Sequence, residues 1–243
     1  MKPHKKLLVI TSLSIAFNYP SVAWAMGKTD DPVLTKTMGE IELLKEGEAD
    51  VAEWEIDTWI GRDFQKFWIK TEGEYAREDG ESEVESAQVE LLYSRTVSAY
   101  WDQQFGIRSD LEPDNGRHWL AFGYRGTAPS FWEIDANVYL GEESSTQLNV
   151  EIEKELMLTQ RWVITPEIEF TINGKTNRDF AEGSGLDNVL LSIRLGYETN
   201  NRKRQPFLGF EGKQFWGATK NIRKTLGKDT DNFSVIAGIH FWF

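Results

Sequence analysis

The sequence predicts an all-β fold, an antiparallel outer-membrane β-barrel of about ten strands, with a short N-terminal arm. The first observation is the end of the chain, Asn232 to Phe243, where every second residue is apolar. A period of two indicates a β-strand with one apolar face. The second observation is that similar segments of about ten residues recur from Lys66 onwards, which is the length of a membrane-spanning strand. The terminal strand alone would fit a soluble β-sandwich equally well.

Composition and charge exclude several classes of protein. The chain of 243 residues is long enough for one sizeable domain. It has no cysteine, which excludes a disulfide framework and thiolate chemistry. The 39 acidic residues outnumber the 27 basic ones, and the formal net charge of −12 argues against nucleic acid as a partner, since nucleic acid requires a basic surface.

Residues 1–25 have the organisation of a secretory signal peptide. Lysines near the start precede an apolar centre at Leu7 to Phe17, and Ala23-Trp24-Ala25 is a small-x-small cleavage site. The alternative is an N-terminal membrane anchor, but the apolar run is short and no stop-transfer pattern follows. We therefore expect export and residence in the outer membrane of a Gram-negative cell, with outer-membrane lipid as a partner. After this segment no run of about 20 apolar residues occurs, so no spanning helix is expected.

Residues 26–61 are interpreted as a periplasmic arm with a short helix. Asp31 is a candidate N-cap, Pro32 fits the first helical position and Gly47 fits the end of the helix. One helical face would carry Leu34, Met38, Ile41 and Leu44. We expect this helix to lie on the barrel mouth or in the lumen.

The segment from Glu53 to Gly61 also has the pattern of a strand. Counting it would give eleven strands, and an odd number would place the C-terminus on the wrong side of the membrane. It is therefore assigned to the arm, and the barrel is expected over residues 62–243. The ten expected strands lie near 66–75, 87–94, 101–110, 118–126, 133–140, 147–156, 162–170, 189–198, 206–215 and 232–243.

Long and short connections alternate between these strands, which predicts long loops outside and short turns in the periplasm, with both termini in the periplasm. Aromatic residues gather at the short turns and predict a girdle at one membrane interface. They are Tyr100, Trp101, Phe131, Trp132, Trp162, Phe207, Trp242 and Phe243. Pro166 lies inside a strand, where it removes one ladder donor and predicts a local bulge.

Because successive side chains of a strand point to opposite faces, the polar face of each strand should line the lumen. Fourteen acids are expected there: Glu72, Glu74, Glu90, Asp102, Asp110, Glu133, Asp135, Glu151, Glu153, Glu155, Glu167, Glu169, Glu198 and Glu211. Six bases accompany them: Lys70, Arg108, Arg125, Arg161, Arg194 and Lys213. Two interpretations remain open. Paired charges can fill a small closed barrel, or the excess of acids can attract cations.

The sequence shows no catalytic motif, and we expect the protein not to be an enzyme. A serine hydrolase would need a Ser-His-acid set in register, and no nucleophile motif is visible. After the leader, only His118 and His240 remain. Alternation places His240 towards the lumen and His118 outwards at the external rim, so the two should not share a metal ion. Each of them can also be a packing histidine.

Many short motifs, in order, resemble the copper resistance protein B family over roughly Trp59 to Phe243. The matching pieces are Leu92-Tyr93-Ser94-Arg95, Trp101-Asp102, Gly106-x-Arg108-x-Asp110, Gly126-x-Ala128-Pro129, Leu158-Thr159-Gln160-Arg161, Gly183-Ser184-Gly185-Leu186, Arg194-x-x-Tyr197, Gly217-Ala218-Thr219 and the Trp242-Phe243 end. The resemblance implies an outer-membrane protein of copper resistance that binds or passes copper ions, with a periplasmic copper protein as a further partner.

The resemblance leads to a hypothesis about copper ligands. Family members often carry a Met- and His-rich stretch before the barrel, whereas this arm has only Met26 and Met38 and no histidine. Copper prefers thioether and imidazole ligands when it is soft, so the expected set is His240, Met38 and Glu211, with weak binding. Lumen acids such as Glu72, Glu74, Glu90, Asp102, Asp110, Glu151, Glu153 and Glu169 would supply attraction. The alternatives are a structural or narrow-pore barrel without a metal role and a soluble exported β-protein.

Overall fold

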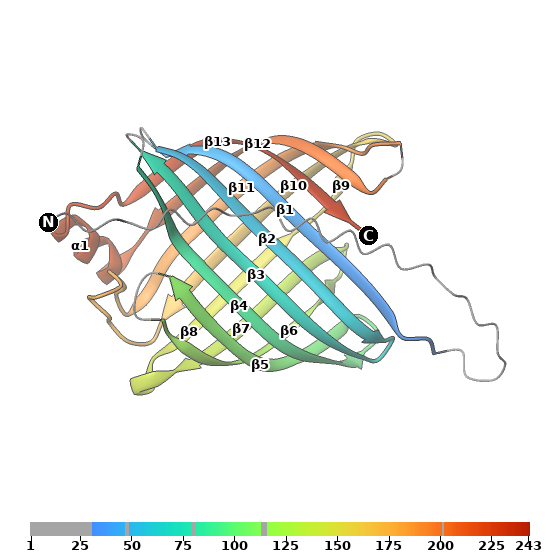
Figure 1. The fold of residues 1–243 in the computed structure, drawn as a ribbon, viewed down its shortest axis with the longest axis horizontal. Helices are drawn as coiled ribbons and strands as arrows, with labels where there is room; N and C mark the ends of the chain where they lie inside the picture. Colours follow the sequence, from blue (N-terminus) through green and yellow to red (C-terminus); the bar gives the residue numbers. More distant parts are fainter. Residues whose placement is uncertain (1–30, 47–48, 79–80, 113–115, 201) are drawn as a thin grey trace, which may run out of the picture. The chain divides into compact units, whose positions relative to one another are not determined.

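The computed structural model describes residues 31–46, 49–78, 81–112, 116–200 and 202–243. These residues form one antiparallel sheet with strand order β11-β12-β13-β1-β2-β3-β4-β5-β6-β7-β8-β10-β9. A further pairing of β11 with β10 closes the sheet into a barrel (Figure 1). β8 and β9 are consecutive pieces of one wall strand, because both pair with β10 in the same register, so the barrel has twelve strands.

The strands are β1 (Leu34–Glu46), β2 (Ala49–Arg62), β3 (Gln65–Glu78), β4 (Glu81–Ser98), β5 (Trp101–Glu112), β6 (His118–Ala128), β7 (Trp132–Gly141), β8 (Thr146–Glu153), β9 (Leu156–Met157), β10 (Trp162–Asn173), β11 (Gly185–Tyr197), β12 (Arg204–Phe215) and β13 (Asp231–Trp242). The helices are the short 3-10 helix η1 (Glu142–Ser144) and α1 (Gly217–Thr225). Within the described part of the chain, no helix has the length and apolar content that crossing a membrane would take.

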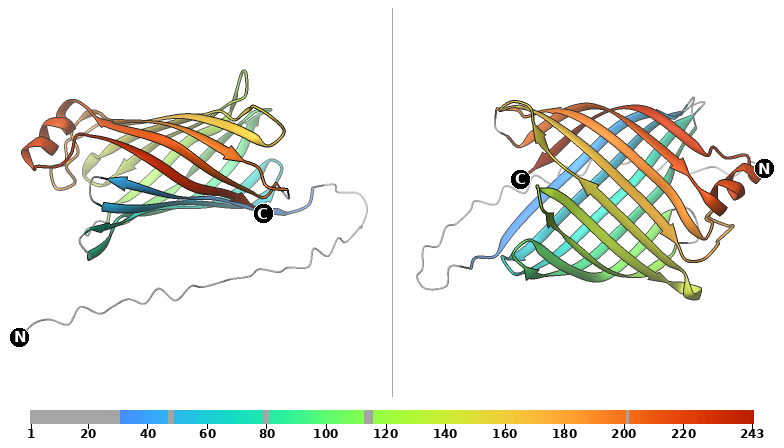
Figure 2. Two further views of the ribbon diagram at one scale, coloured as in Figure 1. Left: turned by 90° about the horizontal axis from the view of Figure 1, so that it is seen from above. Right: turned by 180° about the vertical axis from the view of Figure 1, so that it is seen from behind.

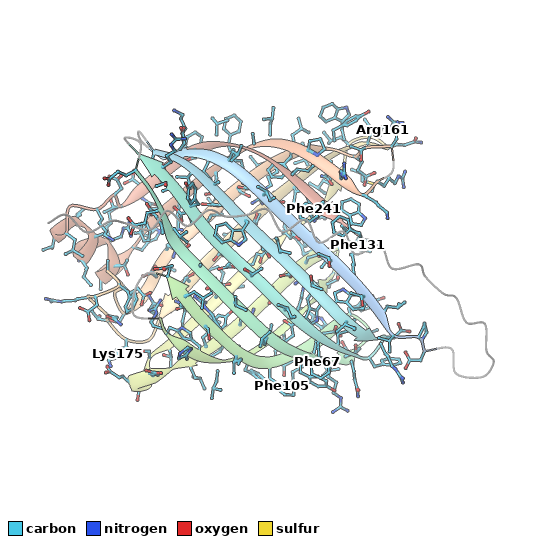
Figure 3. All side chains as sticks on the ribbon, viewed as in Figure 1. Phe67, Phe105, Phe131, Arg161, Lys175 and Phe241 are labelled. Carbon is cyan, nitrogen blue, oxygen red and sulfur yellow. The ribbon has the colours of Figure 1, made fainter. Side chains whose placement is uncertain are left out.

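The expectation of an antiparallel barrel is confirmed, and the ten expected strands correspond to β3–β8 and β10–β13. Alternation predicted them because one face of each strand is apolar and points outwards. In β6, for example, Leu120 is 62% exposed on the outside whereas its neighbour Trp119 is 4% exposed and faces inwards. Figure 3 shows Phe67 and Phe105 on the outside of the barrel, and both rings pack against Tyr93 with centroids 5.2 and 5.1 Å apart.

The periplasmic arm with a helix, expected over residues 26–61, is wrong for the residues that the structure describes. Residues 34–46 and 49–62 form the barrel hairpin β1–β2, and β1 pairs with β13 as well as with β2. The strand pattern prevails over the helical one because Ile41 and Leu43 point outwards whereas Glu40 and Glu42 point into the lumen. The signal peptide expected over residues 1–25 lies outside the described residues.

Two extra strands also resolve the parity problem. The segment from Glu53 to Gly61 belongs to β2 and, together with β1, raises the expected ten strands to an even number. The described N-terminal strand therefore starts at the same end of the barrel where the chain ends, as Figure 2 shows for β1 and the C-terminus.

The two ends of the barrel differ. Short connections at 63–64, 99–100, 129–131 and 158–161 lie at the end that carries the C-terminus, and α1 lies at the opposite end (Figures 1 and 2). Short turns are typical of the periplasmic end. Tyr100 and Phe131 are strongly exposed there, as expected for an interface girdle. Two expected girdle residues are exceptions: Phe207 is buried and faces inwards, and Trp242 lies opposite Met38 on the lumen side of β13.

Pro166 interrupts the ladder, but without the expected bulge at that place. Its carbonyl accepts a hydrogen bond from the Lys154 backbone N–H at 3.2 Å, and the break between β8 and β9 lies opposite it. The register is the same on both sides of the break, with Glu167 opposite Glu153 and Ile164 opposite Leu156. The missing N–H of proline thus removes one ladder position and leaves the register unchanged.

The outward face should respond to charge according to depth. Leu191 lies in the middle of β11 and is 56% exposed on the outside. We expect Leu191→Arg to reduce the free energy of unfolding in lipid vesicles by about 2–4 kcal/mol, because it places a charge in hydrocarbon. Leu158→Arg, in the short connection 158–161, is the matched control and should cost about 0–1 kcal/mol. Equal losses in urea unfolding would contradict the outward assignment.

Candidate functional site

Two cavities occupy the interior of the barrel. The first has a volume of about 800 Å³ and reaches the short-turn end, where its lining includes Tyr100 and Trp101. The second has a volume of about 450 Å³ and its lining includes Arg223 of α1 at the other end. Six residues line both cavities: Glu40, Glu55, Asp135, Glu151, Glu167 and Arg194. The two cavities therefore meet at a level that carries five carboxylates and one guanidinium.

Acidic side chains dominate both linings. Among the described residues, nine carboxylates and three basic groups line the first cavity. Sixteen carboxylates and five basic groups line the second. A wall with a large excess of one charge concentrates the electric field inside a narrow space. The interior therefore attracts cations and repels anions.

A square of four charged groups crosses the lumen at its centre. Lys70 Nζ lies 2.9 Å from Asp135 Oδ2 and 3.9 Å from Asp57 Oδ2. Arg125 Nη1 lies 3.1 Å from the same Asp57 oxygen and 3.6 Å from the same Asp135 oxygen. The four groups come from β2, β3, β6 and β7 and neutralise one another in pairs. This square connects four strands through their lumen faces.

Arg194 on β11 holds a second network. Its Nε donates to Glu42 Oε1 at 2.7 Å, its Nη2 lies 3.2 Å from Glu40 Oε1, and its Nη1 contacts Glu167 Oε2. Ser192 also donates a hydrogen bond to Glu167 Oε2 at 3.0 Å. One guanidinium thus serves three carboxylates, and this network keeps a net negative charge.

A third network lies where β5 ends and β6 begins. Arg108 Nε and Arg117 Nε donate to the two carboxylate oxygens of Asp110 at 2.7 and 3.1 Å. The indole of Trp119 donates to Asp110 Oδ2 at 3.0 Å, and Arg117 also pairs with Glu182 at 2.8 Å. These bonds satisfy Asp110, so it has little capacity left for a passing ion.

Several lumen carboxylates have no basic partner in the part of the chain that the structure describes. Glu90 accepts a hydrogen bond from the Tyr139 hydroxyl at 2.7 Å, and Glu169 accepts one from Asn149 at 2.6 Å. Glu55 and Glu151 have neither an ion pair nor a side-chain hydrogen bond among the described residues, and both line the level shared by the two cavities. These groups make up the acidic surplus.

The structure separates the three residues expected to share a metal ion. His240 on β13 is the register partner of Glu40, and Trp242 is the partner of Met38, so His240 and Met38 are diagonal neighbours on the lumen side of adjacent strands. Met38 packs against the hydrophobic cluster that contains Trp68. The partner of His240 on β12 is Gln205, six residues from Glu211, which is roughly 20 Å along the strand.

Of the fourteen acids expected in the lumen, the eight that were named as attracting the ion do face inwards. Glu72, Glu74, Glu90, Asp102, Glu151, Glu153 and Glu169 line the cavities. Asp110 is buried in the network described above. Their role towards a metal ion stays a prediction.

The sequence reasoning missed the acids of the first hairpin. β1 and β2 contribute Glu40, Glu42, Glu53, Glu55 and Asp57 to the lumen. The signal was present, because Glu53, Glu55 and Asp57 alternate with Trp54 and Ile56 as the acids of the later strands do. Assigning this segment to an arm removed it from the lumen.

Comparison with known sequences assigns most of the chain to one family. The model of the family described as copper resistance protein B precursor (CopB) matches residues 34–243. Copper resistance protein B from Escherichia coli is 29% identical over 206 residues, 85% of this chain and 68% of the relative. The copper resistance protein B homolog from Pseudomonas syringae pv. tomato is 28% identical over 204 residues, 84% of this chain and 68% of the relative.

Two of the solved structures with a similar fold are porins. The NanC porin superposes with a TM-score of 0.58 at 9% identity, covering 84% of this chain and 98% of the porin. The KdgM porin gives a TM-score of 0.50 at 12% identity, covering 85% of this chain and 99% of the porin. At these identities the similarity concerns the fold alone. It agrees with the twelve-stranded outer-membrane barrel described above.

The Arg194 network should be a main source of stability in the lumen. We expect Arg194→Met to lower the free energy of unfolding by about 3 kcal/mol, because three carboxylates lose their only guanidinium. Glu167→Gln in the same background should restore part of this loss. The control is Lys175→Met, which breaks the exposed pair with Glu143 (Lys175 is labelled in Figure 3) and should cost less than about 1 kcal/mol. If Arg194→Met and Lys175→Met lost similar amounts of unfolding free energy in urea, this role would be contradicted.

Proposed function

The chain belongs to the copper resistance protein B family, and we propose that it binds copper ions in its lumen and passes them across the outer membrane. Family membership supports the role in copper resistance. The proposal adds that the barrel acts on the ion directly and without catalysis. Copper is then the cargo of the barrel.

The observation that carries the proposal is the acidic surplus where the two cavities meet. Glu40 and Glu167 share Arg194, and Asp135 is neutralised by Lys70 and Arg125. Glu55 and Glu151 remain at this level without an ion pair among the described residues. An ion that moves between the cavities passes these two carboxylates. Rings of acidic side chains favour cations in narrow pores for the same reason.

A softer ligand pair lies towards the short-turn end. His240 and Met38 face the lumen from adjacent strands, as diagonal neighbours in the β1–β13 register. Diagonal neighbours are about 7–8 Å apart, which long side chains can bridge. Imidazole and thioether suit copper better than they suit hard cations. We propose that this pair contributes selectivity and that carboxylates such as Glu55 and Glu151 contribute attraction.

The position of the pair also indicates where a partner would act. His240 and Met38 lie near the end of β13, because Met38 is opposite Trp242. The C-terminus and the short turns lie at that end of the barrel (Figure 1). That end faces the periplasm if the barrel follows the usual orientation. A periplasmic copper protein would therefore exchange copper at this mouth.

A structural or narrow-pore barrel without a metal role is the second candidate. The observation in its favour is the pair of networks around Arg194 and around Lys70 and Arg125, because paired charges can fill a barrel interior and close it. The two candidates differ in what copper does, so copper binding and copper flux separate them.

The first test measures copper entry into vesicles that contain the full chain and a copper-sensitive dye. Each of Glu55 and Glu151 is assumed to contribute about 0.7 kcal/mol to attraction of the ion, so Glu55→Gln together with Glu151→Gln should lower copper flux by about tenfold. The matched control is Glu143→Gln, an exposed acid on η1, which should leave the flux unchanged. Equal flux in all three proteins, or flux equal to that of empty vesicles, would favour the structural barrel.

The second test concerns the softer pair. In one detergent, copper(I) titration of His240→Ala and of Met38→Leu should each give weaker binding than the wild type, by roughly threefold or more, because one soft donor is lost. His118→Ala removes a histidine on the outside and serves as the control. Unchanged affinity in both lumen variants would remove this pair from the proposal and leave diffuse attraction by the acids.

A further inference from the structure

Three carboxylates meet on the wall of the second cavity, and among the described residues the networks above account for only one of their oxygens. They are Glu42 of β1, Glu53 of β2 and Glu211 of β12, and we call them the carboxylate trio. One carboxylate oxygen from each lies within 4.8 Å of those of the other two. Glu42 and Glu53 are direct register partners. Glu211 joins them from beyond β13, where its register partner is the small residue Ser234.

Two members of the trio are buried, Glu53 is half-buried, and one oxygen of Glu42 has no partner among the described residues. Glu42 is 4% exposed and Glu211 is 7% exposed. Oε1 of Glu42 accepts the bond from Arg194, whereas Oε2 is buried and has no hydrogen-bond partner among the described residues. A buried charged oxygen without a partner is costly, and a bound cation would satisfy it.

The basic groups nearby do not balance the trio. Arg194 divides its charge among Glu40, Glu42 and Glu167. Lys213 lines the same cavity and interacts electrostatically with Glu53 and Glu211, but also with Glu74 and Glu169. Three carboxylates held this close, and opening onto a cavity, have the charge and the access that a cation site needs.

We propose that the carboxylate trio is a binding site for a divalent cation that prefers oxygen ligands and that, among the forms of copper, it takes Cu²⁺ and rejects Cu⁺. The proposal rests on the proposed function, because copper is the cargo. An ion placed among three oxygens that lie within 4.8 Å of one another can be within about 2.8 Å of each, slightly longer than a calcium–oxygen bond of about 2.3–2.6 Å. A slight closure of the glutamate side chains gives the shorter distances of smaller divalent ions.

The chemistry of the donors sets the preference. Carboxylate oxygens suit hard divalent ions, and Cu²⁺ binds oxygen and nitrogen sites more tightly than other divalent ions of the first row. Cu⁺ selects thioether, thiolate and imidazole, and the trio offers none of these. The trio and the His240–Met38 pair therefore serve different oxidation states.

The test is a Cu²⁺ titration of the refolded full chain, followed by electron paramagnetic resonance. We expect one Cu²⁺ signal without splitting from nitrogen ligands, and the same signal in His240→Ala. Glu53→Gln and Glu211→Gln should each weaken binding at this site by about tenfold. Asp63→Asn removes the same charge from the first cavity and is the matched control, with a change of less than twofold. Lys213→Gln should tighten binding by about threefold.

The outcomes separate the trio from the proposed function. Equal Cu²⁺ affinity in Glu53→Gln, Glu211→Gln and Asp63→Asn overturns the trio, even if the wild type binds copper. Nitrogen splitting that disappears in His240→Ala also overturns it.

If the wild type neither binds nor passes copper in any form, the proposed function fails, and a Mn²⁺ titration then decides the trio. Mn²⁺ binding that both glutamine variants lose supports a divalent site, and no Mn²⁺ binding overturns it. A change in gel mobility on heating confirms that each variant is folded. The Lys213→Gln variant tests the trio without removing any of its carboxylates.

Discussion

The hydrogen-bonded seam between β1 and β13 is the interaction on which the rest of the structure depends. In a bilayer, each backbone N–H and C=O must find a partner within the protein, so a sheet with a free edge cannot span it. The seam runs from Met38 opposite Trp242 to Leu43 opposite Ala237, and Thr37 and Phe243 exchange two further backbone bonds of 2.9 and 3.0 Å. Without β1 and β2, the edges of β3 and β13 would remain unpaired.

Closing the sheet in this way also determines the charge of the lumen. The hairpin that provides the seam brings five acids inside, and the strands opposite already present acids at the same level. Lys70, Arg125 and Arg194 neutralise part of this charge and connect strands that are distant in sequence. Because each base is shared by several acids, the interior stays negative. The same side chains thus support the wall and prepare the lumen for cations.

The ten strands from β3 onwards could be predicted because alternation is a local property, as Leu120 and Phe122 show in β6. β1 could not, because Leu34, Met38, Ile41 and Leu44 satisfy a helical period as well, and only pairing with β13 decides between the two. The sequence predicted correctly that the candidate site residues face the lumen, but it did not predict the distances between them. His240 and Glu211 face the same lumen, yet the antiparallel register places Gln205 opposite His240. The carboxylate trio depends on a contact across β13, and no local pattern records such a contact.

Arg194 connects the two kinds of proposed copper ligands. It binds Glu40, the register partner of His240, and also Glu42, which belongs to the carboxylate trio. An ion that moves along β1 between the two sets therefore passes a positive charge that competes for the same acids. Passage through a pore requires sites that attract an ion and still release it, so binding at each site has to be weak. A guanidinium shared among three carboxylates lowers the affinity of each of them without removing the negative field of the lumen. The arrangement suits a barrel that handles an ion in transit better than one that stores it.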